Sequence, residues 1–281
     1  MEPVKVLCIG GSDSSGGAGI QADLKAVSVC GCYGLSIITA VTAQNTQGVQ
    51  YVYPVPQKFI LAQLDSVLSD IGADAVKTGM LLTAGAVESV VKKVKEYRLE
   101  KLIVDPVMIA KGGRSLMQVQ ARNALVKKLL PQTYVLTPNI PEAEILAQFS
   151  IKTVVAMEKA AIVIHKLGAR NVLIKGGHLP GIKKSGALDI LFDGDRCYKF
   201  SAPWIDSIDT HGTGCTYASV LASALALRKN IVDAVWQAKD MVTTAIKNGL
   251  TLGNGHGSVN IFWETFLTKK RGQFPRFKKM L

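Results

Sequence analysis

The sequence predicts an α/β protein with a central, mostly parallel sheet. Short apolar runs rich in β-formers alternate with helical patterns from one end of the chain to the other, as repeated β-α units do. Each run ends in a Gly, Pro or polar segment, which is typical of a strand followed by a loop. Late in the chain two short runs flank Asp193-Gly194-Asp195, and this pattern predicts a small hairpin at the sheet edge.

The expected elements follow one another along the whole chain. The strands are short and apolar: Val4–Ile9, Ser36–Val41, Ala75–Lys77, Leu102–Val104, Tyr134–Leu136 and Val172–Ile174, with Ala187–Phe192 and Arg196–Phe200 as the hairpin. Apolar residues at helical spacing predict helices near 17–30, 57–70, 84–97, 119–129, 141–148, 155–167, 214–228 and 231–249. No repeat, low-complexity linker or composition break interrupts this series, so we expect one domain.

The composition is that of a globular protein with a substantial core. The chain has 281 residues, of which 48% are hydrophobic and 19% charged. It has no uncharged apolar run of membrane-spanning length, and its first residues lack the features of a signal peptide. The five cysteines are odd in number and dispersed, which favours reduced thiols over a disulfide framework. We therefore expect a cytoplasmic protein.

The net charge of +12 raises the question of a nucleic-acid partner. Half of this charge comes from six basic residues after the last acidic one: Lys269, Lys270, Arg271, Arg276, Lys278 and Lys279. Phe274 and Phe277 lie among them and could stack on bases or enter a membrane surface. A solvated terminus is the preferred interpretation, so no specific nucleic-acid or membrane partner is expected. The remaining positive charge suits a protein that handles phosphorylated ligands.

A glycine-rich segment, Asp206–Thr216, carries the strongest functional signal because it runs directly into an apolar helical stretch. A Gly-x-Gly turn that opens a helix leaves backbone N–H groups unpaired beside the positive end of the helix dipole, which predicts an anion or phosphate site. Cys215 lies at the mouth of this turn, where the helix N-terminus is expected to lower the thiol pKa and make it a proton acceptor or nucleophile. A small buried Cys at a glycine-rich helix start is the alternative. We expect His211 to shape the turn and not to act as the base.

Polar residues collect directly after the predicted strands, where open parallel sheets place their ligand crevice. The first strand is followed by Gly10–Leu24, whose small residues allow a ligand to approach the backbone, although neither a dinucleotide fingerprint nor a Walker pattern is present. The second strand is followed by Thr42–Thr46, in which the Gln44 amide can both donate and accept hydrogen bonds, as an aminopyrimidine requires. A turn residue that satisfies local backbone is the alternative for Gln44.

Charged residues follow the later strands. Asp105 comes after the fourth strand and Glu142 after the fifth, and their carboxylates can hold Mg²⁺ directly or through water. Glu142 also fits a helix cap, because it follows Pro141 in a first helical turn. Lys175 ends the next strand beside two glycines, where a cation suits nucleotide phosphates.

Several of these segments recur in the same order in one known family. They are Gly10–Leu24, Ala43–Thr46, Lys77–Met80, Asp105–Met108, Thr137–Ala143, Lys175–His178, His211–Thr216 and Gly255–Asn260. In these motifs the chain resembles the hydroxymethylpyrimidine/phosphomethylpyrimidine kinases of thiamine biosynthesis, which belong to the ribokinase-like superfamily. The match runs from about residue 4 to residue 262. We therefore expect one ribokinase-like kinase domain over 1–265 and a basic C-terminal tail over 266–281.

The resemblance implies a three-layer α/β/α fold, a homodimer, a requirement for ATP and Mg²⁺, and two successive phosphorylations that give the pyrimidine diphosphate used to make thiamine. It also implies roles for individual residues. For the pyrimidine pocket these are Gln44 and Met80, with Gly11, Asp23 and Val107 as neighbours. For the nucleotide they are Asn139, Lys175 and Glu142, for the metal Asp105 and Glu142, and for catalysis Gly212, Thr213, Gly214 and Cys215. Most of the wider superfamily has an Asp base where the pyrimidine-kinase branch, like this chain, has Cys.

Two other functions stay open. Some proteins with this Cys-type loop accept pyridoxal, so a pyridoxal/pyridoxine kinase of vitamin B6 salvage is the nearest alternative. A non-catalytic nucleic-acid or membrane-binding protein that uses the basic tail is a remote one. The intact set Asp105, Asn139, Glu142, Lys175 and Cys215 argues against loss of catalysis.

Overall fold

The computed structural model describes residues 2–108, 116–177, 179–181 and 186–263. Within these residues nine strands form one sheet in the order β3-β2-β1-β4-β5-β6-β7-β8-β9. In chain order the strands are β1 (Lys5–Asp13), β2 (Tyr33–Asn45), β3 (Gly48–Pro54), β4 (Ala75–Thr78), β5 (Leu102–Val104), β6 (Val135–Leu136), β7 (Asn171–Lys175), β8 (Ala187–Phe192) and β9 (Cys197–Ala202). The expected tail, 266–281, lies outside the described residues, as does His178.

The helices connect these strands. They are α1 (Gly19–Val29), α2 (Gln57–Asp70), α3 (Ala84–Glu96), α4 (Val119–Ala124), α5 (Ile140–Ala147), α6 (Val154–His165), α8 (Thr213–Ala226) and α9 (Ile231–Lys247). The expected helix at 119–129 is shorter, because α4 passes into a π turn at Leu125–Leu129 and a 3₁₀ turn at Leu130–Gln132. None of the described helices is both long enough and apolar enough to cross a membrane.

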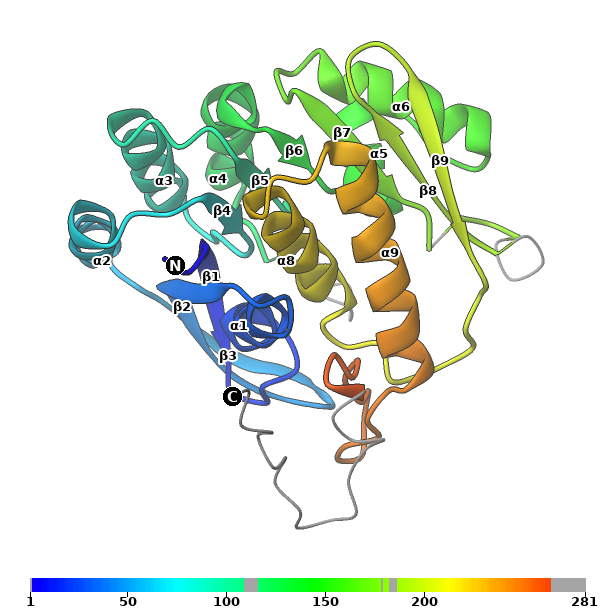
Figure 1. Cartoon of the computed structure of the whole chain (residues 1–281), viewed down its shortest axis with the longest axis horizontal. Helices are drawn as coiled ribbons and strands as arrows, with labels where there is room; N and C mark the ends of the chain where they lie inside the picture. The colour runs from blue at the N-terminus through cyan, green and yellow to red at the C-terminus, as the bar shows by residue number, and fades with distance from the viewer. Residues whose placement is uncertain (1, 109–115, 178, 182–185, 264–281) are drawn as a thin grey trace, which may run out of the picture.

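The sheet is covered on both faces, which confirms the three-layer α/β/α fold. Helices α2 to α6 pack on one face, and α1, α8 and α9 pack on the other, in front of the sheet in Figure 1. Side chains of β1 alternate between the two layers: Leu7 and Ile9 face the first, Val6 and Cys8 the second. A strand buried on both sides is mostly apolar, and this explains the short apolar runs of the sequence.

Strands β2, β1, β4, β5, β6 and β7 run parallel, and the edges are antiparallel. The expected hairpin at one edge is confirmed as β8 and β9. At the other edge β3 pairs antiparallel with β2 and was not expected from the sequence. Its Tyr51 and Tyr53 are exposed, so β3 lacks the buried apolar run that marks the other strands.

The strand order places a ligand crevice beside β1. From β1 the chain moves to β2 and β3 on one side and then crosses to β4 on the other side. In open α/β sheets ligands bind at the carboxyl ends of the strands next to such a reversal. The polar segments singled out in the sequence lie at the carboxyl ends of β1, β2, β4, β5, β6 and β7, so they share this edge of the sheet. Strands β1 and β2 are longer than expected, because Gly10–Asp13 and Thr42–Asn45 continue them instead of forming loops.

Candidate active site

Two glycine-rich segments meet at the start of α8. Gly212 is the N-cap of this helix with φ +81°, a left-handed conformation that favours glycine. A Cβ on Gly212 would overlap the backbone oxygen of Gly17, so the absence of a side chain lets the two loops touch. The first helical bond runs from Thr216 N–H to Gly212 O at 2.9 Å, and the N–H groups of Gly214 and Cys215 precede it. Helix geometry leaves such groups without an intrahelical partner, as an anion site requires.

A cation and a carboxylate face this helix start. Lys175 Nζ at the end of β7 donates to Asp105 Oδ1 after β5 at 2.8 Å, and Thr137 Oγ1 donates to the same oxygen at 3.1 Å. A Cβ on Gly214 would lie 3.4 Å from Lys175 Nζ and 3.5 Å from Asp105 Oδ2. Burial alone would lower the pKa of Lys175, but the carboxylates of Asp105 and Glu142 raise it. The structure therefore brings the glycine loop, Lys175 and Asp105 together.

Glu142 is a helix cap that also faces Asp105. Its Oε2 accepts from Asn139 N–H at 3.0 Å, and the Asn139 side chain accepts from Glu142 N–H at 3.0 Å, which is a capping box for α5. Its Oε1 accepts from Met108 N–H at 3.1 Å. Burial and the charge of Asp105 raise the pKa of Glu142. The capping interpretation of Glu142 is confirmed, and Asn139 is its partner in the cap.

The donor set fits a magnesium ion held partly by phosphate. Among the described residues, no group of three or more His, Cys, Asp or Glu side chains forms a metal site. Within the described residues, the hydrogen bonds from Thr137 and Lys175 to the Asp105 carboxylate reach Oδ1, whereas Oδ2 lies on the side of Gly214. Mg²⁺ commonly takes one or two carboxylates and completes its shell with water and substrate phosphates. Asp105, with Glu142 acting through water, suits that arrangement.

The Cys215 thiol is not acidified in this environment. Burial raises its pKa to about 11; Lys77 opposes this rise, while Asp23 and Asp105 add to it. The Gly19 N–H also lowers the value by hydrogen bonding, but not enough to offset burial. The expectation that the thiol pKa is lowered is therefore wrong, because burial, together with the carboxylates of Asp23 and Asp105, raises the pKa more than Lys77 and the Gly19 N–H lower it.

A buried ion pair that the sequence did not reveal lies beneath the thiol. Lys77 Nζ donates to Asp23 Oδ1 at 2.7 Å and to Oδ2 at 2.8 Å, and both side chains have an exposed fraction of 0%. Ser219 Oγ donates to Asp23 Oδ1 at 2.8 Å. Ser219 follows Cys215 by one turn of α8, so both residues face the pair. Asp23 is thus fully engaged below the surface, and a pocket role for it stays a prediction.

Gly11 and Met80 are in contact, as two residues of one pocket should be. A Cβ on Gly11 would overlap the Met80 terminal methyl, and Thr39 Oγ1 holds the Met80 carbonyl at 2.6 Å. Val107 lies apart on the segment after Asp105, where it is half-buried and adopts φ +33°. A positive φ is strained for a β-branched residue and is commonest at binding sites. The structure thus leaves its pocket role as a prediction.

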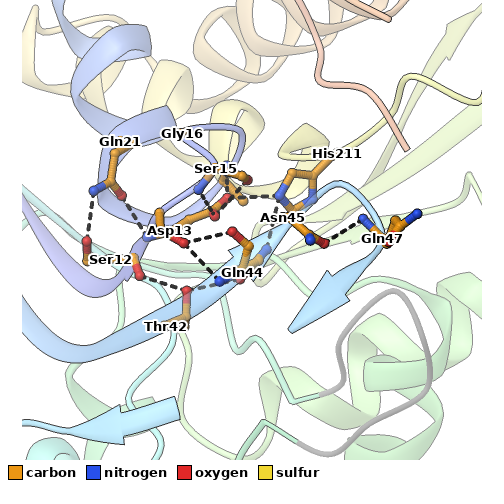
Figure 2. Close-up of polar contacts among 12 residues, drawn as sticks. Ser12, Asp13, Ser15, Gly16, Gln21, Thr42, Gln44, Asn45, Gln47 and His211 are labelled. Carbon is orange, nitrogen blue, oxygen red and sulfur yellow. Dashed lines mark hydrogen bonds and ion pairs between the residues drawn. The ribbon is translucent and has the colours of Figure 1, made fainter. Parts of the chain in front are cut away.

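Gln44 lies in a hydrogen-bonded cluster that also contains residues not singled out in the sequence. Its Nε2 is 3.2 Å from His211 Nε2, which is itself 2.9 Å from Asp13 Oδ2 (Figure 2). Thr42 Oγ1 is 3.2 Å from Gln44 Oε1. Asp13 was visible only as part of the first glycine-rich run, and no spacing pattern indicates its pairing with His211, which lies 198 residues away.

Comparison with known proteins identifies a family for this chain. A family model described as phosphomethylpyrimidine kinase matches residues 13–260. The chain belongs to this family. The resemblance seen in the sequence motifs is therefore confirmed.

Curated relatives agree with the family. The chain is 50% identical over 255 residues to a thiamine biosynthesis bifunctional protein of Geobacter sulfurreducens, with 91% of this chain and 51% of that protein covered. The chain thus spans about half the length of that relative. It is 45% identical to the hydroxymethylpyrimidine/phosphomethylpyrimidine kinase of Bacillus subtilis, with 93% and 96% covered.

Solved structures of two kinds resemble the fold. A pyridoxal kinase of Bacillus subtilis in an ADP complex has a TM-score of 0.87 at 38% identity, with 94% of this chain and 99% of that chain covered. A phosphomethylpyrimidine kinase from Clostridium difficile has a TM-score of 0.77 at 43% identity, with 87% and 100% covered. A pyridoxal kinase from Staphylococcus aureus with AMP-PCP and pyridoxal has a TM-score of 0.85 at 35% identity, with 93% and 94% covered.

Proposed function

We propose that the protein transfers the terminal phosphoryl group of ATP first to 4-amino-5-hydroxymethyl-2-methylpyrimidine and then to the resulting monophosphate. The observation that carries this proposal is the convergence of the α8 glycine loop, Lys175 and Asp105 at one edge of the sheet. Gln44 lies at the end of β2 and Met80 follows β4 at the same edge, where the acceptor would bind. The names of the relatives at 42–50% identity support the same substrate.

The geometry supports a role for each group in phosphoryl transfer. Such reactions depend mainly on positioning and on neutralising charge at the transferring group. The N–H groups of Gly214 and Cys215 would bind the transferring oxygens, whereas the Thr213 N–H already donates to Thr210 O at 3.4 Å. Lys175 would leave Asp105 to meet the nucleotide phosphates. Mg²⁺, held by Asp105 and through water by Glu142, would neutralise phosphate charge when bound.

Cys215 is the candidate acceptor for the proton of the substrate hydroxyl. A thiol with a pKa of about 11 is protonated near neutral pH, so only a small fraction is ready to accept that proton in the empty site. The loop amides and Lys175 therefore supply most of the rate enhancement. The second step attacks from a phosphate oxygen that is already ionised, so it needs no base.

Replacement of Gln44 by Leu tests the substrate assignment. Loss of amide pairing with the aminopyrimidine should cost about 1–3 kcal/mol in transition-state binding, or roughly a 5–150-fold loss in kcat/KM. Gln47→Leu is the matched control, since Gln47 is exposed on the adjacent turn. Equal kcat/KM values for wild type and Gln44→Leu with the pyrimidine would contradict the assignment.

Pyridoxal phosphorylation is the second candidate. It is favoured by the close superposition of two pyridoxal kinases on this fold, with TM-scores of 0.87 and 0.85. A pyridoxal-preferring enzyme should be insensitive to Gln44→Leu, because that vitamer lacks the amino group and adjacent ring nitrogen. Parallel assays with both acceptors therefore separate the two functions.

We also propose a homodimer and a cytoplasmic location. Val41 on β2 and Tyr51 and Tyr53 on β3 form one exposed apolar face, since Val41 lies opposite Tyr53 in the register. A second copy of the chain would bury this face at the open sheet edge. All five cysteines are free thiols, as a reducing compartment favours. Light scattering of wild type and a Tyr51→Ser/Tyr53→Ser variant tests the dimer, which the variant should weaken.

A further inference from the structure

One imidazole nitrogen is shared between two polar side chains. His211 Nε2 lies 2.9 Å from Asp13 Oδ2 and 3.2 Å from Gln44 Nε2. The three residues come from the end of β1, the end of β2 and the loop before α8 (Figure 2). A single nitrogen either donates its own proton or accepts one from a neighbour. Its hydrogen bonds to Asp13 and to Gln44 therefore depend on the same protonation state of His211 Nε2.

Asp13 decides which state the nitrogen takes. Its carboxylate accepts from Ser15 N–H at 2.9 Å, Ser15 Oγ at 2.7 Å and Ala18 N–H at 2.8 Å. Burial alone would raise the pKa of Asp13, but the hydrogen bonds from His211, Ser15 and Ala18 lower it to about 2. Asp13 is therefore ionised at neutral pH. A bare nitrogen at 2.9 Å from an ionised oxygen would be repelled, so His211 Nε2 carries a proton.

The opposite end of the Gln44 amide gives an independent constraint. Thr42 Oγ1 is 3.0 Å from the Ser12 carbonyl oxygen and 3.2 Å from the near end of the Gln44 amide. The carbonyl oxygen can only accept, so it takes the single hydroxyl proton of Thr42. The amide atom beside Thr42 must then donate. The amide atom beside the protonated His211 nitrogen must accept, and both requirements are met when Oε1 lies beside His211 and Nε2 beside Thr42.

We propose that His211, Asp13 and Thr42 are positioning residues that hold the Gln44 amide in this one orientation. Gln44 then accepts on its His211 side and donates on its Thr42 side, and it selects a planar heteroaromatic ring that offers a donor and an adjacent acceptor in matching order. This inference rests on the proposed role of Gln44 in binding the acceptor. It adds that selectivity for the acceptor ring comes from the neighbouring residues that fix the orientation of the Gln44 amide, and not from Gln44 alone.

The backbone keeps His211 from turning away. Its N–H donates to Gly257 O at 3.0 Å, and its carbonyl accepts from Val259 N–H at 3.1 Å. A Cβ on Gly17 would overlap the Ser258 hydroxyl and lie 2.5 Å from His211 Cδ2, so the ring packs directly against a glycine. The imidazole is thus held by the protein on two sides, and its proton position is set by Asp13.

The tautomer is the first test. The ¹⁵N resonances of His211, assigned by comparison with His211→Gln, should report that the neutral ring carries its proton on Nε2. A neutral ring with the proton on Nδ1 would overturn the inference. This measurement needs no catalytic turnover, so its result is informative even if the proposed kinase activity is not observed.

Ligand discrimination is the second test. The 4-oxo analogue of the pyrimidine reverses the order of donor and acceptor, so wild type should bind it at least tenfold more weakly than the 4-amino compound in calorimetry. His211→Leu allows the Gln44 amide to rotate and exchange its oxygen and nitrogen, so it should reduce this affinity ratio severalfold. His211→Gln keeps an N–H donor near the same place, so it should largely preserve the ratio. His165→Gln on α6 is the control for a histidine replacement.

A role confined to folding predicts a different result. Equal weakening of both ligands in His211→Leu, with the ratio unchanged, would contradict a positioning role. Thermal unfolding of each variant identifies any that fail to fold. Gly17→Ala provides a second way to disturb the position of the His211 ring. Its methyl would crowd both the His211 ring and the Ser258 hydroxyl without removing a polar group, so it should reduce the ratio in the same direction as His211→Leu.

Discussion

Lys77 and Asp23 show how much of the site depends on contacts between distant residues. They lie 54 positions apart, and in the sequence Lys77 is a single cation at the end of an apolar run. Folding places both under the Cys215 thiol, where Lys77 lowers and Asp23 raises the thiol pKa. The positions of Gln44, Asp105, Lys175 and Cys215 at strand or helix ends were predictable from local pattern. Their protonation states were not, because those depend on neighbours from other elements.

Removal of one partner of this pair should be costly. Lys77→Met leaves a buried carboxylate uncompensated and should lower the free energy of unfolding by about 3–5 kcal/mol. The double variant Lys77→Met/Asp23→Leu removes both charges and should lose much less. Urea unfolding of wild type and both variants checks this, and equal losses in the single and double variants would contradict it.

The thiol pKa predicts how Cys215 reacts with an alkylating agent. Because the folded-state pKa is raised to about 11, the thiolate fraction, and hence the iodoacetamide rate at Cys215, should be small near pH 7 and rise about tenfold per pH unit toward pH 11. Modification is followed by mass spectrometry at this residue. A rate that levels off below about pH 8 would show that the thiol is acidified after all.

The two phosphorylations should respond differently to loss of the thiol. Cys215→Ala should slow the first step by about 10²–10⁴-fold or less, because that is what a general base typically contributes. The second step should be affected much less, since its nucleophile is already ionised. Single-turnover rates for each step, with circular dichroism to confirm folding, make the comparison; equal losses in both steps would rule out a base role.

At the level of elements, local pattern predicted most helices and strands because the parallel strands are buried on both faces. The exception, β3, is an exposed edge strand, and its Tyr51 and Tyr53 give no buried run to recognise. The start of α8 was predicted as an anion site from its glycines. Its close contact with the loop after β1 was not, since nothing local indicates that Gly17 O meets Gly212.

That contact can be tested with two matched glycines. Gly212 and Gly31 have φ of +81° and +77°, so an Ala is similarly strained at either position. Only at Gly212 does the new Cβ meet backbone, whereas around Gly31 there is open space. Gly212→Ala should therefore lower kcat about 10²-fold or more, and Gly31→Ala should leave it near wild type. Similar steady-state kinetics for both variants would show that the loop contact does not position the amides.

At the level of the whole molecule, the reversal of strand order beside β1 brings the residues of the candidate site to one edge of the sheet. The residues proposed for the acceptor lie mainly at the ends of β1, β2 and β4, and those proposed for the nucleotide and the metal follow β5, β6 and β7, so all of them share one sheet edge. This arrangement was predictable from the alternation of strands and helices, and the family assignment agrees with it. We propose that the choice of acceptor depends on a few side chains around Gln44, which the fold alone does not determine.

The most direct test of the account is to incubate the purified protein with Mg²⁺-ATP and 4-amino-5-hydroxymethyl-2-methylpyrimidine and to resolve the products by anion-exchange chromatography. The account predicts transient monophosphate followed by diphosphate, with two ADP formed per pyrimidine. Pyridoxal, assayed in parallel, should be the poorer acceptor. Phosphorylation of pyridoxal with no pyrimidine diphosphate would contradict the account.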